Sequence, residues 1–129
     1  MEEKSIRILL IDDEVDFTQP MAFWLESKGY SVTVANDPES GLRLAKESPP
    51  DIVFLDLNMP VMNGIEVLKK IREFNTDLPI IIISAYVDEY RAEETIPYAI
   101  SGIFYKGSDF NKGLALIETA LRTHKKLKK

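Results

Sequence analysis

Apolar runs alternate with amphipathic stretches along the whole chain. Three of the apolar runs are almost continuous in large hydrophobic residues, as strands are when helices cover both faces of a parallel sheet. Another run alternates apolar and polar residues, which predicts a strand at the edge of the sheet. The five runs that predict strands are Ile6–Ile11, Ser31–Ala35 (the alternating one), Ile52–Leu55, Ile80–Ile83 and Gly102–Tyr105.

Between these runs, apolar residues recur at the spacing of a helix that buries one face. Asp37 and Pro38 are typical of a helix start, because Asp caps free N–H groups and Pro suits the first helical position. Gly29 predicts the end of the first helix. A further helix is expected over about residues 88–99, with Pro97 near its end. The four apolar stripes are Phe17, Met21, Trp24 and Leu25; Leu42, Leu44 and Ala45; Ile65, Val67, Leu68 and Ile71; and Leu114, Ile117 and Leu121.

This alternation predicts an α/β fold: a doubly wound five-stranded parallel sheet with helices on both faces, forming a three-layer sandwich. With 129 residues the chain fits one domain, which we place at residues 4–123, followed by a basic C-terminal tail at 124–129. Sheets of this kind bind ligands beyond the carboxyl ends of their strands, where the strand order reverses. The residues directly after each strand are therefore the first candidates for chemistry.

The charge is distributed unevenly. All 21 acidic residues precede Thr119, whereas five of the 16 Lys and Arg residues follow Leu121, and the formal net charge is −5. The acidic body argues against direct binding of nucleic acid by this domain. For the basic tail we favour the interpretation that its cations complement the C-terminus of the last helix. The alternative is the start of a linker to an output domain.

The absence of cysteine excludes disulfides, thiolate metal sites and cysteine nucleophiles. It also fits a reducing compartment, so we expect a cytoplasmic protein. Near the N-terminus, the apolar run Ile8–Ile11 is short and is closed at once by carboxylates. Such a run predicts neither a signal peptide nor a membrane span.

The residues that end four of the predicted strands are chemically complementary. Asp12 and Asp13 follow the first strand, Asp56 follows the third, and Ser84 and Lys106 follow the fourth and fifth. At one sheet edge, each pair of carboxylates about 5 Å apart would cost roughly 3 kcal/mol at an effective dielectric constant of about 20. A hard cation such as Mg²⁺ relieves that repulsion. Carboxylates, a metal, a hydroxyl and an ammonium group together suit phosphoryl transfer with a carboxylate as the nucleophile.

Taken singly, each of these residues has an ordinary structural interpretation. Acids after a strand often cap the next helix, and a lone lysine or serine is most often a solvated or satisfied surface group. The functional interpretation rests on four strand ends that contribute complementary groups to one edge.

Four motifs resemble those of the receiver domains of two-component response regulators, and the resemblance covers nearly the whole chain. They are Asp12-Asp13-Glu14, Asp56-Leu57-Asn58-Met59-Pro60 followed by Asn63-Gly64, Ser84-Ala85 and Lys106. The resemblance implies a flavodoxin-like sheet with strand order 2-1-3-4-5 and phosphorylation of Asp56. It also implies that Asp13, Asp56 and the backbone carbonyl of Asn58 bind Mg²⁺, with Asp12 helping through water. Ser84 and Lys106 would then contact the phosphoryl oxygens.

The resemblance further implies a histidine kinase or a histidine phosphotransfer protein as the phosphoryl donor, with no membrane contact. Output would go to a downstream protein or an attached output domain through the face formed by the fourth helix, fifth strand and fifth helix, and homodimerisation is one expected response to phosphorylation. One alternative is a phosphatase of the dehalogenase class, but Asp12-Asp13-Glu14 does not supply its D-x-D nucleophile motif. A second alternative, an unphosphorylated pseudo-receiver that binds proteins, is disfavoured by the complete set of acids, hydroxyl and lysine.

The chain departs from the pattern of this family around its fifth strand. Ile103 stands where the family usually has Tyr or Phe as a rotamer switch, and Ile is stiff at χ1 and has no ring to turn. An alternative register would make Phe104 the switch. Gly107 replaces a proline that commonly follows the lysine, so we expect a trans peptide or a strained cis one. Ala99-Ile100 stands where Gly-Ala is usual. These departures predict an unusual partner surface.

Tyr86 lies two residues beyond Ser84, at the expected rim of the site. We favour a packing role for its ring; the alternative is that the ring hinders an attacking water and prolongs the life of the phosphoryl group. His124 lies in the basic tail and is assigned no role in phosphotransfer.

Overall fold

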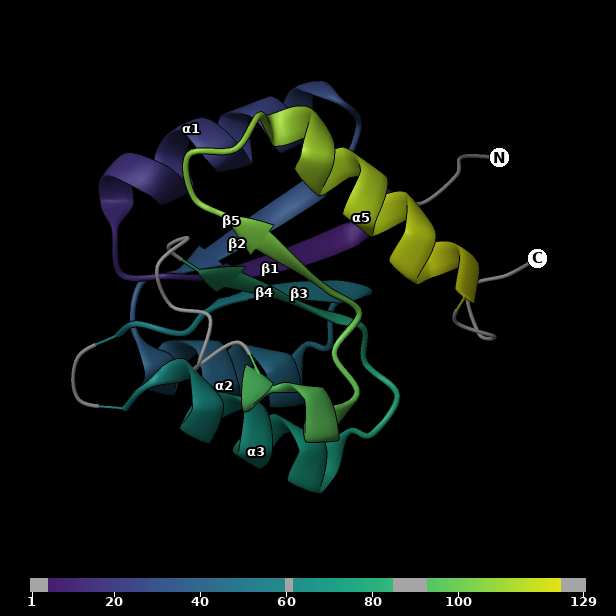
Figure 1. Ribbon diagram of the computed structural model, residues 1–129. Helices are drawn as coiled ribbons and strands as arrows, with labels where there is room; N and C mark the ends of the chain where they lie inside the picture. Colours follow the sequence, from purple (N-terminus) through teal and green to yellow (C-terminus); the bar gives the residue numbers. More distant parts are fainter. Residues whose placement is uncertain (1–4, 60–61, 85–92, 124–129) are drawn as a thin grey trace.

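The structure is a computed structural model that describes residues 5–59, 62–84 and 93–123 (Figure 1). Its elements are β1 (Arg7–Ile11), α1 (Val15–Ser27), β2 (Ser31–Ala35), α2 (Pro38–Glu47), β3 (Ile52–Asp56), α3 (Gly64–Phe74), β4 (Ile80–Ser84), the 3₁₀ helix η1 (Ile96–Tyr98), β5 (Gly102–Tyr105) and α5 (Phe110–Thr123). The strands form one parallel sheet in the order β2-β1-β3-β4-β5. In Figure 1, α1 and α5 cover one face of the sheet, and α2 and α3 cover the other. The predicted fold class and strand order are confirmed.

The sheet separates two hydrophobic cores, because successive side chains of a strand point to opposite faces. Every residue of β3 and β4 is buried, as expected for central strands covered on both sides. In β2, by contrast, the first four residues alternate between exposed and half-buried positions, and the strand lies at the edge, as predicted. One core holds Leu9 and Leu55 on the side of α2 and α3, and the other holds Leu10 and Phe54 on the side of α1 and α5.

The register of the strands aligns their carboxyl ends. Ile11 of β1 lies opposite Leu55 of β3, so the next residue along β1 reaches the level of the last residue of β3. On the other side, Ser84 of β4 lies opposite Tyr105 of β5. The residues that follow these strands therefore gather at one end of the sheet.

Local signals in the sequence set the helix ends. The Asp37 carboxylate accepts a hydrogen bond from the backbone N–H of Ser40 at 2.8 Å, which caps α2. After α1, Gly29 adopts φ +100°, and its N–H donates to the carbonyl of Glu26, while the N–H of Tyr30 donates to the carbonyl of Leu25. This pair of bonds is a Schellman motif, which needs a residue in the left-handed region. Both predicted boundaries are confirmed.

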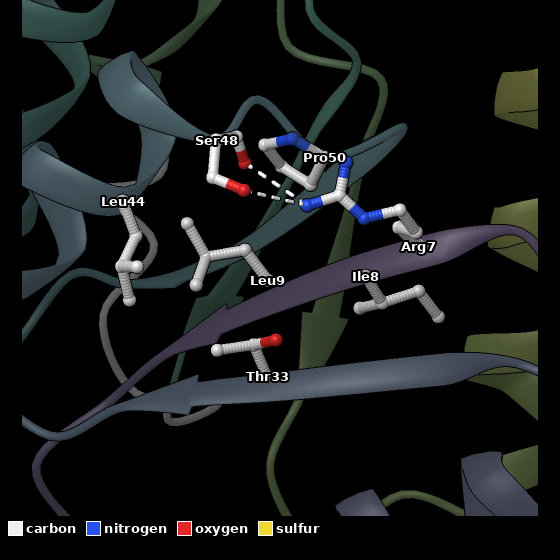
Figure 2. A pocket seen from close by; sticks show the side chains of 7 residues that line it. All are labelled: Arg7, Ile8, Leu9, Thr33, Leu44, Ser48 and Pro50. Carbon is white, nitrogen blue, oxygen red and sulfur yellow. Dashed lines mark hydrogen bonds between the residues drawn. The ribbon is translucent and has the colours of Figure 1, made fainter.

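At the amino end of the sheet, the side chain of Arg7 forms hydrogen bonds with the loop that follows α2. The Arg7 guanidinium donates to the Pro49 carbonyl at 2.8 Å and to the Ser48 hydroxyl at 2.9 Å, so it ties β1 to the connection between α2 and β3. Figure 2 shows Arg7 facing Ser48 beside a cavity of about 30 Å³. This end of the sheet is therefore a structural junction, in contrast to the carboxyl end.

The helix expected over residues 88–99 ends differently from the prediction. Ile96–Tyr98 form the short η1, and Ala99 then adopts the left-handed conformation with φ 58°. The prediction of an α-helix over residues 96–99 is wrong, because Pro97 has no N–H to donate and Ala99 turns the chain out of the helical region. Residues 88–92 lie outside the described residues. No helix in the described part of the chain is long and apolar enough to cross a membrane.

Candidate functional site

Three aspartates gather at the carboxyl end of the sheet. Asp12 follows β1, Asp13 is its neighbour, and Asp56 ends β3. One carboxylate oxygen from each lies within 4.8 Å of those of the other two. Asp12 and Asp56 are 0% and 1% exposed, while Asp13 is half-buried. The three residues therefore present oxygens to one point from two adjacent strands.

Lys106 approaches this cluster from the end of β5. Its Nζ lies 3.1 Å from Asp12 Oδ2 and 3.7 Å from Asp56 Oδ2, and it makes a further close contact with the carboxylate of Glu14. The ammonium group also lies 5.1 Å from the centre of the Phe17 ring, a cation–π arrangement. The backbone N–H of Lys106 donates to the carbonyl of Ser84 at 2.9 Å, which fixes the position of the lysine backbone beside the end of β4.

Burial of two neighbouring carboxylates shifts their pKa values upward. Desolvation, followed by the charge of Asp12, raises the pKa of Asp56 from 3.8 to about 7, although Lys106 acts in the opposite direction. Desolvation also raises the pKa of Asp12. Burial lowers the pKa of Lys106, but its hydrogen bond to Glu14 and the charges of the nearby aspartates outweigh that effect, so the net shift of the pKa is upward. One lysine thus compensates the acidic cluster only in part.

The cluster has the donor set of a site for a hard divalent cation. Asp12 Oδ1 accepts the backbone N–H of Glu14 at 2.9 Å, and Asp56 Oδ1 accepts that of Asn58 at 3.2 Å. The second oxygens, Asp12 Oδ2 and Asp56 Oδ2, are buried and accept no hydrogen bond. Buried oxygens of this kind suit Mg²⁺, which prefers carboxylate, carbonyl and water ligands. The acidic cluster can therefore bind a metal ion.

A cavity of about 370 Å³ opens beside the cluster. Its lining combines acidic, amide and ammonium groups from the ends of three strands: Asp13, Glu14, Asp56, Asn58 and Lys106. Ser84 is fully buried at the end of β4, the strand that lies between β3 and β5. The cavity is large enough for a phosphoryl group, and Asp56 lies in its wall.

The motif Asn63-Gly64 has two structural roles next to Asp56. The Asn63 side chain accepts the N–H of Glu66 at 3.0 Å and so caps α3. At Gly64 an added Cβ would lie 2.2 Å from the backbone oxygen of Asp56 and 2.6 Å from the Cα of Leu57. Only glycine allows α3 to begin this close to the end of β3.

Sequence reasoning assigned no individual role to Glu14 or Phe17, and the structure places both against Lys106. Glu14 was part of a recognised acidic motif and Phe17 part of an apolar stripe. Their spacing from Asp12, two and five residues, places them in the connection and in the first turn of α1. In the sequence, the signal for a role of these two residues in the site is their position close to the end of the first strand.

The departures around β5 take a defined form. Ile103 is half-buried against the core on the side of α2 and α3, whereas Phe104 is 1% exposed and packs on the opposite face, 6.3 Å from the Phe17 ring. The two candidate switch positions therefore lie on opposite faces of the sheet, and Phe104 is part of the buried core. The peptide bond before Gly107 is trans, and Gly107 has φ +92°. Tyr86, Ala85, Pro60 and His124 lie outside the described residues.

Comparison with known sequences relates the chain to one family. The sequence model described as "Response regulator receiver domain" matches residues 8–118. The response regulator ArlR of Staphylococcus epidermidis is 34% identical over 115 residues, which cover 89% of this chain and 52% of ArlR. The probable transcriptional regulatory protein TcrX of Mycobacterium tuberculosis is 29% identical over 120 residues, 92% of this chain and 48% of TcrX. The chain spans about half the length of these two relatives.

Comparison with solved structures agrees. The receiver domain of NtrX from Brucella abortus superposes with a TM-score of 0.85 at 28% identity, covering 90% of this chain and 98% of that one. A CheY-like response regulator receiver domain protein from Methanospirillum hungatei gives a TM-score of 0.89 at 22% identity, covering 95% and 98%, which supports the fold.

Proposed function

This chain belongs to the response regulator receiver domain family, and from that premise we propose that Asp56 is the residue that accepts the phosphoryl group. A receiver domain is the phosphorylation-activated switch of a two-component system. The observation that supports Asp56 most directly is its second oxygen, Oδ2, which is buried, accepts no hydrogen bond and lies 3.7 Å from Lys106 Nζ. No other described carboxylate combines these features with a place in the cavity wall.

The chemistry assigned to Asp56 is a simple exchange of bonds. A carboxylate oxygen of Asp56 forms a bond to phosphorus while the bond from phosphorus to the donor's leaving group breaks, which gives an aspartyl phosphate. Lys106 is positioned to bind a phosphoryl oxygen, and we assign the hydroxyl of Ser84 the same task. Both groups neutralise or hydrogen-bond charge that the phosphoryl oxygens bring into a buried site.

Asp13, Asp56 and the backbone carbonyl of Asn58 are the proposed ligands of Mg²⁺, with Asp12 acting through a water molecule. The ion, when bound, neutralises the charge that gathers on the phosphoryl oxygens. The two carboxylate oxygens without hydrogen bonds support this assignment, since a cation would satisfy them. Asp12 is more deeply buried than Asp13, which fits the less direct role.

As a receiver, the domain is proposed to act in signalling and not to turn over an external substrate. A phosphatase of the dehalogenase class is the alternative enzyme, and its nucleophile would lie after β1. In this chain Asp12 bonds the backbone of Glu14 and pairs with Lys106, whereas Asp56 after β3 lines the cavity. A lack of phosphate release from ester substrates, beyond loss from Asp56 itself, would support the signalling role.

The phosphoryl donor is proposed to be a histidine kinase or a histidine phosphotransfer protein, and the location to be cytoplasmic. The relatives named above are regulators about twice as long as this chain. A downstream protein or an output domain is therefore the proposed recipient of the signal, through the surface of β5 and α5.

The test is binding of beryllofluoride, a phosphoryl mimic, in the presence of Mg²⁺. Wild type should bind it and Asp56→Asn should not, because the amide cannot replace the carboxylate that completes the adduct. Asp16→Asn is the matched control: it removes one acid from an exposed position in the first turn of α1. Equal binding by wild type and Asp56→Asn would refute the assignment.

A further inference from the structure

One contact in the site that the proposed function does not use joins Lys106 to Glu14. Among the carboxylates around Lys106 Nζ, that of Glu14 is the nearest, ahead of Asp12 at 3.1 Å and Asp56 at 3.7 Å. We propose that Glu14 is a positioning residue that holds the Lys106 ammonium at the mouth of the cavity until a phosphoryl group on Asp56 draws it inward. This inference rests on the proposed function of Asp56. It adds an ion pair that must break when Lys106 binds the phosphoryl group.

The backbone of Glu14 is held by hydrogen bonds at the start of α1, while its side chain takes no part in them. Its N–H donates to Asp12 Oδ1 at 2.9 Å, and its carbonyl accepts the N–H groups of Phe17 and Thr18 at 3.0 Å as α1 begins. Glu14 occupies the N-cap position of α1, yet its side chain makes no capping hydrogen bond. The carboxylate contacts Lys106 instead. The side chain of Glu14 is therefore committed to the lysine and has no competing role in starting the helix.

The contact is suited to being broken. The Glu14 side chain is 61% exposed, whereas those of Asp12 and Asp56 are 0% and 2% exposed. A solvent-exposed ion pair is weak, because water screens it and two long side chains lose freedom to form it. A phosphoryl group brings nearly two negative charges to the buried position of Asp56, where screening is much less. Lys106, which already lies within 3.7 Å of Asp56 Oδ2, would then give up its exposed partner Glu14 and keep the buried side of the site.

Loss of the contact between Glu14 and Lys106 should increase the affinity of the site for a phosphoryl mimic. With Glu14→Gln the lysine no longer has to leave an ion pair, so beryllofluoride should bind about two- to fivefold more tightly, the range expected for one exposed pair. Glu14→Asp keeps the charge but is one methylene shorter and should also gain affinity. Asp16→Asn removes a neighbouring exposed acid that has no contact with Lys106 among the described residues, and should leave affinity unchanged.

The experiment measures beryllofluoride affinity by calorimetry with saturating Mg²⁺ for wild type and these three variants. The same set is followed by the ¹⁵Nζ resonance of Lys106, with and without beryllofluoride. A merely structural role for Glu14 would not move that resonance. We expect Glu14→Gln to shift it in the free protein, and the difference from wild type to disappear once beryllofluoride is bound.

Three outcomes would overturn the inference. In the first, Glu14→Gln binds with wild-type affinity while binding still depends on Asp56; this refutes the role of Glu14 and leaves the proposed function intact. In the second, Glu14→Gln and Asp16→Asn gain affinity equally, which shows general charge repulsion. In the third, Asp56→Asn binds as wild type does, which refutes the proposed function and this inference together.

Discussion

The carboxyl end of the sheet and the segment from η1 to Gly107 adjoin at Lys106, but they differ in how closely they follow the pattern of their family. At the sheet end, every expected group is present, and the positions are enforced by strand register and by backbone hydrogen bonds to Asp12 and Asp56. In the segment, Ile96–Tyr98 form a short 3₁₀ helix, Ala99 is left-handed, and Gly107 follows a trans bond at the position where the resemblance implies a proline. Phosphoryl chemistry requires fixed charges at fixed distances, whereas a surface that transmits a signal can be rebuilt for each partner.

Among the predicted changes, removal of the buried charge at Asp56 should alter the free energy of unfolding the most. In the metal-free protein, Asp56→Asn is expected to raise the free energy of unfolding at pH 8 by on the order of 3 kcal/mol, since burial raises the pKa of this carboxyl from 3.8 to about 7. The raised pKa makes the ionised form costly in the folded state. The gain should be full above pH 7 and vanish as the pH falls toward 3.8. Urea denaturation with excess chelator at pH 8 and pH 4 measures it.

Asp16→Asn serves as the control, because that acid is exposed. A wild-type protein as stable as Asp56→Asn at pH 8 would mean that the site holds its acids without strain.

Gly64→Ala tests how rigidly the same end of the sheet is built. The added Cβ would lie 2.2 Å from the Asp56 backbone oxygen, so β3 or α3 must shift, at a cost of about 2–3 kcal/mol. Beryllofluoride binding should weaken as well, because Asp56 moves with its backbone. Gly113→Ala in α5 is the matched control: its nearest neighbour is the flexible end of Met21 at 3.3 Å. Thermal unfolding that is the same for both variants would contradict the prediction.

Arg72→Met asks whether the segment after β4 is held as firmly as the site. The Arg72 Nε donates to the carbonyl of Tyr98 at 2.9 Å, and another guanidinium nitrogen donates to that of Ala99 at 3.3 Å. Loss of these charged hydrogen bonds should cost about 2 kcal/mol and increase hydrogen exchange around η1. Lys69→Met, on an exposed position of α3, controls for the lost charge. If exchange around η1 stays at the wild-type rate, Arg72 does not anchor it.

The smallest expected change is a gain from Ala99→Gly. Ala99 has φ 58°, a conformation that glycine adopts without a steric penalty, so the substitution should stabilise the protein by about 0.5–1 kcal/mol. The same change at Ala115, an exposed position inside α5, should destabilise it by a similar amount. Opposite signs in chemical denaturation would confirm the strain at Ala99, and a loss at both positions would contradict it.

Prediction from the sequence succeeded where local patterns control structure. Each strand lies within one residue of its predicted bounds, because runs of buried hydrophobic residues are directly visible in the sequence. The α2 start at Asp37-Pro38 and the α1 end at Gly29 followed from capping chemistry. The helix expected up to residue 99 failed over 96–99, where the carbonyls of Tyr98 and Ala99 are held by Arg72 from a different helix. The spacing of apolar residues along the sequence carries no information about such a contact between distant residues.

The sequence by itself determined the order of strands and helices and the residues placed at the strand ends, because hydrophobic period and helix caps are local properties. Only the tertiary structure decided how deeply Asp12 and Asp56 are buried, and that Glu14 is the nearest carboxylate to Lys106. Those features depend on distances between residues more than forty positions apart, and on the removal of water from the space between them. The raised pKa of Asp56 follows from that burial, so it too belongs to the fold and not to any motif.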